Sequence, residues 1–155
     1  MEKVLDHGFV RLVDHMPQKE LDSAIVQSAR VSYGDGTKTS SSDRGLIRYL
    51  LRHYHTTPFE MVDFKFHIKM PLYIARQHFR HRTSSINELS ARYSVVPKEY
   101  YEPATYRGQS KINHQGSEGV VELKNNLDKK VSQQLSQSFD VYEELLENGC
   151  CREQA

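Results

Sequence analysis

Residues 80–94 hold the side chains of this sequence that are best suited to chemistry with an anionic ligand. They include three arginines, one histidine, one glutamate and four serines: Arg80, Arg82, Arg92, His81, Glu88, Ser84, Ser85, Ser90 and Ser94. Arg76 adds another cation just upstream. Because a guanidinium group captures phosphate or carboxylate through two parallel hydrogen bonds, this composition predicts an anion-binding site.

The groups around these arginines suit the remaining parts of a nucleotide. On a helix, Gln77 and Arg80 share one face, so an amide that can read a carbonyl or imide edge lies beside a cation. Glu88 can orient an arginine or accept a hydrogen bond from a sugar hydroxyl. Ser90 and Arg92 alternate, and on an extended segment they would face the same side. We therefore expect a nucleotide pocket; the alternative is a solvated basic helix end followed by a polar loop.

Ser90 and two histidines allow more than one interpretation. A nucleophilic serine needs a base within reach, and His81 could approach Ser90 only if the chain folds back. We expect Ser90 to be a hydrogen-bond donor and keep catalysis as its alternative role. His53 and His55 precede a Thr-Pro pair, and they are either loop histidines without a role or contacts for a planar ligand.

The overall composition limits the possible functions. A chain of 155 residues is sized for one domain, residues 1–155, with a sizeable core. Charged residues make up 26% and the net charge is +1, which argues against nucleic acid as a partner. The alternative of an RNA-binding domain is not favoured either, because the sequence has no aromatic RNA-binding motif. No apolar run reaches membrane-spanning length and no secretory signal opens the chain. We therefore expect a cytoplasmic protein without nucleic-acid or membrane partners.

The cysteines carry little predicted chemistry. Cys150 and Cys151 are adjacent, and a bond between neighbours is strained, so free thiols in a reducing compartment are expected. No second Cys or His pair has ligand spacing, so we predict no metal site. Neither cysteine falls in a pocket that the sequence predicts.

Alternating strands and helices are expected to position these residues. Residues 4–14 are rich in β-branched and aromatic side chains and predict a strand, and residues 61–70 alternate apolar with polar side chains and predict another. Two helices between them are predicted to begin at Leu21 and, behind a serine N-cap, at Asp43. The other predicted boundaries are the end of the first helix near Ser32, loops at 34–36 and 40–42, and a helix stop at Thr57-Pro58.

The second half of the chain is predicted to be helical on either side of a long loop. Pro71 can open a helix because its missing N–H costs nothing there. Residues 95–116 hold prolines, glycines and tyrosines and predict a long loop. Apolar residues then recur at helical spacing over one long helix near 117–147, which Asn148-Gly149 ends. The predicted fold class is α+β, with a mainly antiparallel or mixed sheet packed with helices.

The order of residues in the arginine-rich segment resembles a family signature. The pattern Arg80-His81-Arg82-x-x-Ser85-x-Asn87-Glu88-x-Ser90-x-Arg92-Tyr93 is similar to that of the flavin-dependent thymidylate synthases, with all fixed positions filled. Other segments follow in family order: Ala29-Arg30-Val31-Ser32, His55-Thr56-Thr57-Pro58-Phe59-Glu60, Ala75-Arg76-Gln77 and Gly149-x-x-Arg152-Glu153-x-Ala155. The resemblance covers essentially the whole chain.

This resemblance implies a flavoprotein methyltransferase that converts dUMP to dTMP by reductive methylation. Methylenetetrahydrofolate would supply the carbon, FAD would carry the hydride and NADPH would reduce the flavin. The family also implies a homotetramer in which several subunits share each active site. Hydride delivery from a flavin would remove the need for a cysteine nucleophile.

The resemblance also assigns expected roles to individual residues. The positions that match dUMP-binding residues are Gln77, Arg80, Glu88, Leu89, Ser90, Ala91, Arg92 and Arg152. The positions that match FAD-binding residues are Thr57, Arg80, His81, Arg82 and Glu88, with Ser32 and His55 as additions. Family chains continue with a helical segment beyond the position of Ala155, which carries further flavin contacts and the arginine associated with polarising the uracil. The alternative function is therefore a catalytically incompetent nucleotide-binding fragment of such an enzyme.

Overall fold

The structure is a computed structural model that describes residues 1–33 and 42–155, so the predicted loops at 34–36 and 40–42 lie outside it except for Ser42. The described chain forms two compact units. The first contains Met1–Lys3 and Phe9–Lys69, and the second contains Val4–Gly8 and Met70–Ala155. That the whole chain is a single domain stays a prediction.

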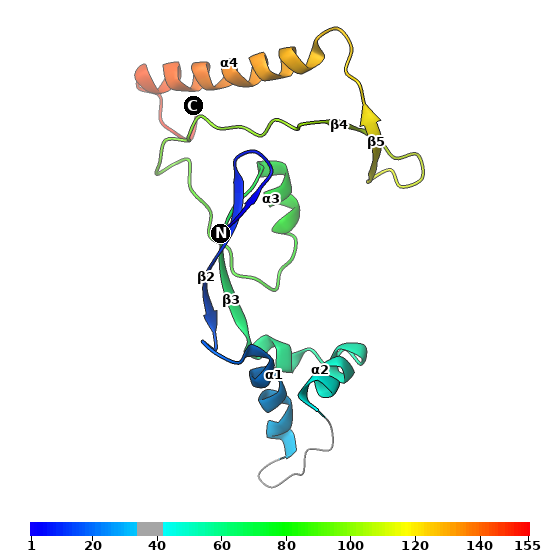
Figure 1. The fold of residues 1–155 in the computed structure, drawn as a ribbon. Helices are drawn as coiled ribbons and strands as arrows, with labels where there is room; N and C mark the ends of the chain where they lie inside the picture. The colour runs from blue at the N-terminus through cyan, green and yellow to red at the C-terminus, as the bar shows by residue number, and fades with distance from the viewer. Residues whose placement is uncertain (34–41) are drawn as a thin grey trace. The chain divides into compact units, whose positions relative to one another are not determined.

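A three-stranded sheet belongs mainly to the first unit, with the strands β1 (Glu2–Val4), β2 (Gly8–Met16) and β3 (Asp63–Lys69) in that order (Figure 1). Strands β2 and β3 pair antiparallel, from Phe9 opposite Lys69 to Met16 opposite Asp63. The pairing shifts between Leu12 and Asp14, which leaves one extra residue on β2 as a bulge. The predicted strand at 61–70 is confirmed.

The predicted strand at 4–14 was wrong in extent, because the chain turns between β1 and β2. Leu5 adopts a left-handed φ of 60°, and the Asp6 carboxylate accepts the His7 N–H at 2.7 Å. An aspartate that bonds its neighbouring backbone favours a turn over a continuous strand. The result is a short β1 and a longer β2 where one strand was expected.

Two helices form the core of the first unit, and both were predicted. Helix α1 (Leu21–Arg30) continues into a short 3₁₀ turn, η1 (Val31–Tyr33), and its Val26 is fully buried. Helix α2 (Asp43–Arg52) begins behind Ser42, whose hydroxyl accepts the Gly45 N–H at 3.2 Å. The predicted helix stop at Thr57-Pro58 was wrong, because α2 already ends at Arg52 and Tyr54 adopts a left-handed φ of 56°. A second 3₁₀ turn, η2 (Thr57–Met61), begins at Thr57 instead, and α1 packs against both α2 and η2.

The second unit contains α3 (Leu72–His78), a hairpin of β4 (Tyr106–Gln109) and β5 (Ser117–Val121), and the long helix α4 (Leu127–Glu147) (Figure 1). The hairpin corrects two predictions, since it lies partly in the expected loop 95–116 and partly in the expected helix 117–147. Gly108 permits the pairing, because a Cβ there would lie 2.9 Å from the Glu118 carbonyl oxygen.

Helix α4 begins at Leu127, ten residues later than position 117, where the long helix was expected. Asn125 and Asn126 have left-handed φ angles of 59° and 53°, which break the helix before Leu127. Asparagine tolerates this conformation better than other non-glycine residues. At the other end Gly149 has a φ of 85°, so the predicted Asn-Gly helix end is confirmed.

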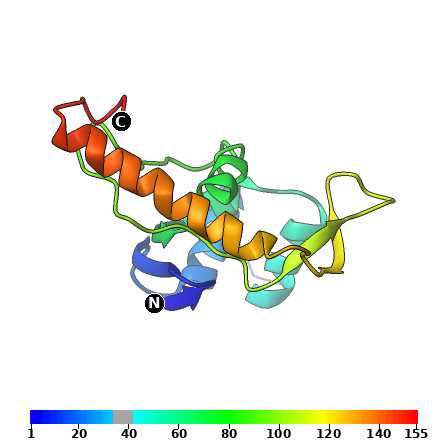
Figure 2. The same cartoon turned by 90° about the horizontal axis from the view of Figure 1, so that it is seen from above.

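The segment that precedes β4 runs along α4 in the opposite direction, which Figures 1 and 2 both show. The Val96 N–H donates to the Tyr142 hydroxyl at 3.0 Å, and Lys98 Nζ lies 2.6 Å from the Asp140 carboxylate. The hydrogen bond to Asp140 raises the pKa of Lys98 above its usual value. The ring of Tyr100 stacks on that of Phe139 at 5.8 Å. This part of the predicted loop is therefore attached to a helix.

The fold class is α+β, as predicted, with antiparallel sheets and a long C-terminal helix. No helix in the described part of the chain is long and apolar enough to cross a bilayer.

Candidate functional site

The predicted nucleotide residues begin on α3 and continue through the turns after it. Ala75 is the buried anchor of this short helix, while Gln77 is exposed and donates to the Tyr73 carbonyl at 3.3 Å. Arg80 follows the helix in a turn, with its N–H donating to the Gln77 carbonyl at 3.2 Å. Arg80 therefore lies just beyond α3, so the predicted placement of Gln77 and Arg80 on one helix face was wrong in its helical geometry, and their shared contact with a base stays a prediction.

Three charged side chains of the segment are exposed and unpaired. Within residues 1–33 and 42–155, the side chains of Arg80, Arg82 and Glu88 make no hydrogen bond or ion pair. Glu88 therefore does not orient an arginine in the isolated chain, which was one of its two predicted roles. The guanidinium N–H groups of Arg80 and Arg82 therefore have no partner among the described residues, and they can donate to an anionic ligand.

Ser90 sits at the start of a turn, so the extended geometry expected for Ser90 and Arg92 was wrong. The N–H groups of Tyr93 and Ser94 both donate to the Ser90 carbonyl, at 3.2 and 3.1 Å. The Ser90 hydroxyl accepts the Arg92 N–H at 3.2 Å, which is the local bonding that makes serine a turn residue. Its own proton stays available to a ligand, as the predicted donor role requires.

The turn brings Arg92 next to residues from the far end of the chain. Arg92 Nε lies 2.5 Å from the Glu153 carboxylate, and Arg152 Nη1 donates to the Tyr93 carbonyl at 3.2 Å. The chain after α4 makes one further turn, in which the Ala155 N–H donates to the Cys151 carbonyl at 3.1 Å. Arg92 and Arg152 were predicted to share a ligand from positions far apart in sequence, and the structure places them together.

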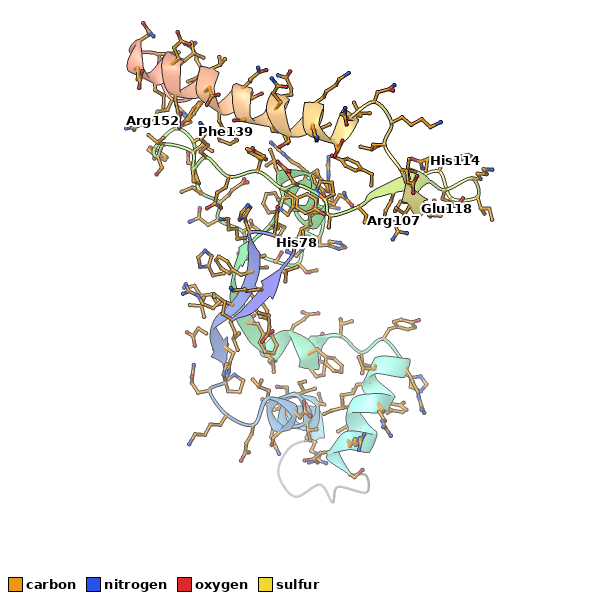
Figure 3. The ribbon with its side chains drawn as sticks, turned by 45° about the horizontal axis from the view of Figure 1, so that its top comes forward. His78, Arg107, His114, Glu118, Phe139 and Arg152 are labelled. Atoms are coloured by element: carbon orange, nitrogen blue, oxygen red, sulfur yellow. The ribbon has the colours of Figure 1, made fainter. Side chains whose placement is uncertain are left out.

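Arg92 and Arg152 line a cavity of about 480 Å³ in the second unit, and the label in Figure 3 places Arg152 just past the end of α4. Cys150 and Cys151 line the same cavity. The structure therefore places both cysteines at a cavity where the sequence predicted none. No local sequence pattern links them to Arg92, because this arrangement depends on how the turn after α4 packs.

Three of the predicted flavin residues meet around a different cavity, in the first unit. Ser32 in η1, His55 after α2 and Thr57 at the start of η2 line a space of about 440 Å³. The floor of this space is apolar, and the residues that complete it are Ala29, Leu46, Leu50, Pro58 and Met61, with Ser28 and Tyr49. A mainly apolar cavity with a few polar groups is the usual form of a cofactor pocket.

Two of the residues that line this cavity, Tyr49 and His55, belong to an aromatic cluster that also contains His53, and the sequence did not predict this cluster. The Tyr49 ring lies 4.3 Å from that of His53 and 6.1 Å from that of His55, between ring centroids. Tyr49 is on α2 and the two histidines follow that helix, so the end of α2 brings all three into contact. His55 at the cavity therefore agrees with the interpretation as a contact for a planar ligand, whereas His53 does not line the cavity.

The remaining predicted residues are exposed. Leu89 and Ala91 flank Ser90 on the surface of the second unit, and His81 lies near His78, with 6.3 Å between ring centroids. Leu89 is 68% exposed, so it is not part of a core. Among the described residues, no group of three His, Cys, Asp or Glu side chains is arranged to hold a metal ion.

A larger cavity of about 1060 Å³ also lies in the second unit, between the β4–β5 hairpin and the start of α4. None of the predicted site residues lines it. Figure 3 labels Arg107, His114 and Glu118 on the hairpin, and the Ser110 hydroxyl donates to the Glu118 carboxylate at 3.3 Å. This hairpin is held by its own polar contacts and shows no link to the arginine-rich segment.

Comparison with known proteins identifies the class of this chain. Residues 11–155 match the family model described as thymidylate synthase complementing protein, and the chain belongs to that family. A flavin-dependent thymidylate synthase of Thermus thermophilus is 56% identical over 154 residues, which span 98% of this chain and 55% of that protein. A flavin-dependent thymidylate synthase of Dictyostelium discoideum is 51% identical over 164 residues, which span 97% of this chain and 52% of that protein.

This chain also resembles a solved structure. A UMP/dUMP methylase from Streptomyces cacaoi, crystallised with 5-Br dUMP, superposes with a TM-score of 0.80 and 33% identity. The match covers 99% of this chain and 67% of that one. The chain spans about half the length of the curated relatives it matches, 55% for the Thermus thermophilus protein.

Proposed function

We propose that this chain is part of a flavin-dependent thymidylate synthase, which converts dUMP to dTMP by reductive methylation. Methylenetetrahydrofolate is the carbon donor, NADPH is the reductant, and bound FAD supplies the hydride. The observation that carries the proposal is the meeting of Arg92 and Arg152 at one cavity, from two segments that both resemble the family. The 56% identity to a flavin-dependent thymidylate synthase supports it.

In this proposal the second unit binds dUMP. Arg92 and Arg152 hold the phosphate, Gln77 and Arg80 contact the base, and Ser90 donates its free proton, with Glu88, Leu89 and Ala91 around it. Arg92 is released at little cost, because an exposed ion pair such as Arg92–Glu153 is worth about 0–1 kcal/mol. Charge-assisted hydrogen bonds to a phosphate contribute about 1.5–3 kcal/mol each, so the ligand can displace Glu153.

The first unit is proposed to hold the flavin through Ser32, His55 and Thr57. The apolar surface of Leu46, Leu50 and Met61 suits the flat ring system, and the polar groups at its edge suit the ring carbonyls or the sugar chain. Arg80, His81, Arg82 and Glu88 are proposed as further FAD contacts. In the complete enzyme the protein's task is to stack flavin against the uracil ring and to stabilise the negative charge that develops there.

The complete enzyme is proposed to be a cytoplasmic homotetramer whose active sites are shared between subunits. The unpaired, exposed state of Arg80 and Arg82 in one chain agrees with a site completed by other copies. No catalytic residue of this chain is assigned, and catalysis by Ser90 is the alternative to its proposed role as a hydrogen-bond donor.

A titration of dUMP into the chain, followed by calorimetry, tests the nucleotide site. Replacing Arg92 by lysine keeps the charge but removes bidentate binding, and we expect the Kd to rise about tenfold. Arg44→Lys on the exposed face of α2 is the matched control and should leave the Kd unchanged. Equal Kd values for the wild type, Arg92→Lys and Arg44→Lys would refute the placement of the phosphate.

A second candidate function is supported by the coverage of the relatives, 55% and 52% of their lengths. This chain on its own would then be a catalytically incompetent fragment that binds dUMP and does not turn it over. The two candidates differ in flavin binding, because the fragment is expected to bind dUMP in the absence of retained FAD.

A further inference from the structure

Helix α2 carries three arginines on its exposed side to which neither ligand considered so far gives a role. Arg44, Arg48 and Arg52 follow one another at intervals of four residues, and all three are exposed. Residues four apart on a helix lie one above the other, so these side chains form one arginine stripe along α2. Like charges at this spacing destabilise a helix. The arginine stripe is therefore a surface that gains from an anionic ligand.

The carboxylates around α2 do not neutralise the arginine stripe. Asp43 is the one acidic residue of the helix, and its carboxylate lies 2.9 Å from Arg30 of α1. Glu20 and Asp22 at the start of α1, and Glu60 in η2, form no ion pair with the stripe. Within residues 1–33 and 42–155, the three guanidinium groups of the stripe make no hydrogen bond at all. Their N–H donors are open to a ligand.

The end of α2 places an aromatic surface beside this stripe. Arg52 follows Tyr49 by three residues, so the two side chains are neighbours on the helix surface. The His53 N–H donates to the Tyr49 carbonyl at 3.1 Å, and the two ring centroids lie 4.3 Å apart. Both residues are exposed, Tyr49 by 53%. Accessible aromatic rings stack on nucleotide bases, so this end of α2 combines phosphate-binding groups with a surface for a planar ring.

We propose that Arg48, Arg52 and His53 bind the 2′-phosphoadenosine end of NADPH, an inference that rests on the proposed function with NADPH as reductant. The guanidinium groups of Arg48 and Arg52 hold the 2′-phosphate through paired N–H donors, and the adenine ring lies against His53. The 2′-phosphate distinguishes NADPH from NADH, and arginine is the side chain that accommodates it in other dinucleotide sites.

The position of this site agrees with the work of a reductant. Tyr49 belongs to the aromatic surface and also lines the first-unit cavity proposed for the flavin. The adenosine end is therefore bound next to that cavity, and the rest of the dinucleotide extends toward the flavin. His53, which does not line the cavity, receives a role in this arrangement.

Arg44 lies outside the proposed site and provides a control on the same helix. It precedes Arg52 by eight residues, which is roughly 12 Å along the axis of α2. Because salt screens exposed charges over about 8 Å at physiological ionic strength, Arg44 contributes little to a phosphate held by Arg52. Arg44→Gln removes the same charge as Arg52→Gln and differs from it only in place.

Calorimetric titrations of the full chain with NADP⁺ and NAD⁺, in saturating FAD, test the site, because these ligands differ only in the 2′-phosphate. We expect NADP⁺ to bind about tenfold more tightly. Arg48→Gln and Arg52→Gln should each remove most of this preference, whereas Arg44→Gln should change the Kd of NADP⁺ by less than about twofold. His53→Ala should weaken both ligands about equally, because it removes the stacking surface and no charge. Circular dichroism should show the same helix content in all variants.

Three results would overturn the proposed site. They are equal binding of NADP⁺ and NAD⁺ by the wild type, an equal loss in Arg44→Gln and Arg52→Gln, and displacement of NADP⁺ by inorganic phosphate at the same concentration, which would indicate a general anion surface.

Flavin retention through desalting separates this inference from the proposed function. A chain that retains FAD and shows no preference for NADP⁺ would overturn the site on α2 and leave the proposed function standing. A preference that Arg52→Gln removes, in a chain that does not retain FAD, would support the site on α2 and contradict flavin binding by this chain.

Discussion

Replacing Tyr142 by phenylalanine tests how the segment after the arginine-rich residues is attached to α4. The Tyr142 hydroxyl accepts the Val96 N–H at 3.0 Å in a partly buried setting. Phenylalanine keeps the ring and removes only this acceptor. A hydrogen bond contributes about 1 kcal/mol net, and a fully buried unpaired amide can cost up to about 3 kcal/mol. Because water can reach Val96, we expect the smaller value.

Amide hydrogen exchange at Val96, followed by NMR, measures this effect directly. A loss of about 1 kcal/mol corresponds to exchange roughly fivefold faster. Tyr54→Phe is the control, because Tyr54 is 88% exposed, and it should leave the exchange of Val96 unchanged. Unaltered exchange in Tyr142→Phe, or equal acceleration in both variants, would refute the attachment through Tyr142.

Three further predictions concern stability and pH. Ser42→Ala removes the cap of α2 and should lower the free energy of unfolding by about 1 kcal/mol, measured by urea denaturation, whereas an unchanged midpoint would contradict the cap. Val26→Ala, at a fully buried position, should cost about 1–3 kcal/mol in the same assay, while Val31→Ala, 77% exposed, should cost almost nothing. The hydrogen bond from the Glu102 N–H lowers the pKa of Asp6 below 3.8, so this carboxylate stabilises the folded chain above that pH and less as the pH falls through its folded-state pKa. Asp6→Asn should therefore show a shallower loss of stability below pH 3.8, and acid unfolding identical to wild type would contradict this.

Local sequence signals predicted the elements whose boundaries are set by local chemistry. The Ser42 cap, the opening of α3 at Pro71 and the glycine after α4 all depend on residues within one turn of the boundary. The alternating strand near 61–70 was predicted for the same reason, since side chains point to opposite faces in turn.

Elements were predicted wrongly where short polar contacts compete with a longer apolar pattern. Val120 fits the apolar spacing of the predicted helix 117–147, but it belongs to β5, and the left-handed Asn125 and Asn126 separate the two elements. The turn after Ser90 depends on one hydroxyl bonded to its own backbone, a contact that alternation does not reveal.

The sequence predicted which residues form the candidate site, but it did not predict how they are arranged in space. Arginine chemistry indicated an anion site, and the family signature linked Arg92 with Arg152. Their actual proximity comes from the turn after α4, in which Glu153 and the Tyr93 carbonyl take part. The cavity shared with Cys151 depends on that same packing, so no local sequence pattern could have predicted it.

The absorbance spectrum of the chain, recorded with FAD before and after dUMP is added, tests the proposed function most directly. The account predicts oxidised flavin bands that stay with the protein through desalting and shift when dUMP binds, because the two rings stack. A colourless protein that binds dUMP without ever retaining flavin would contradict flavin binding by this chain and support the nucleotide-binding fragment.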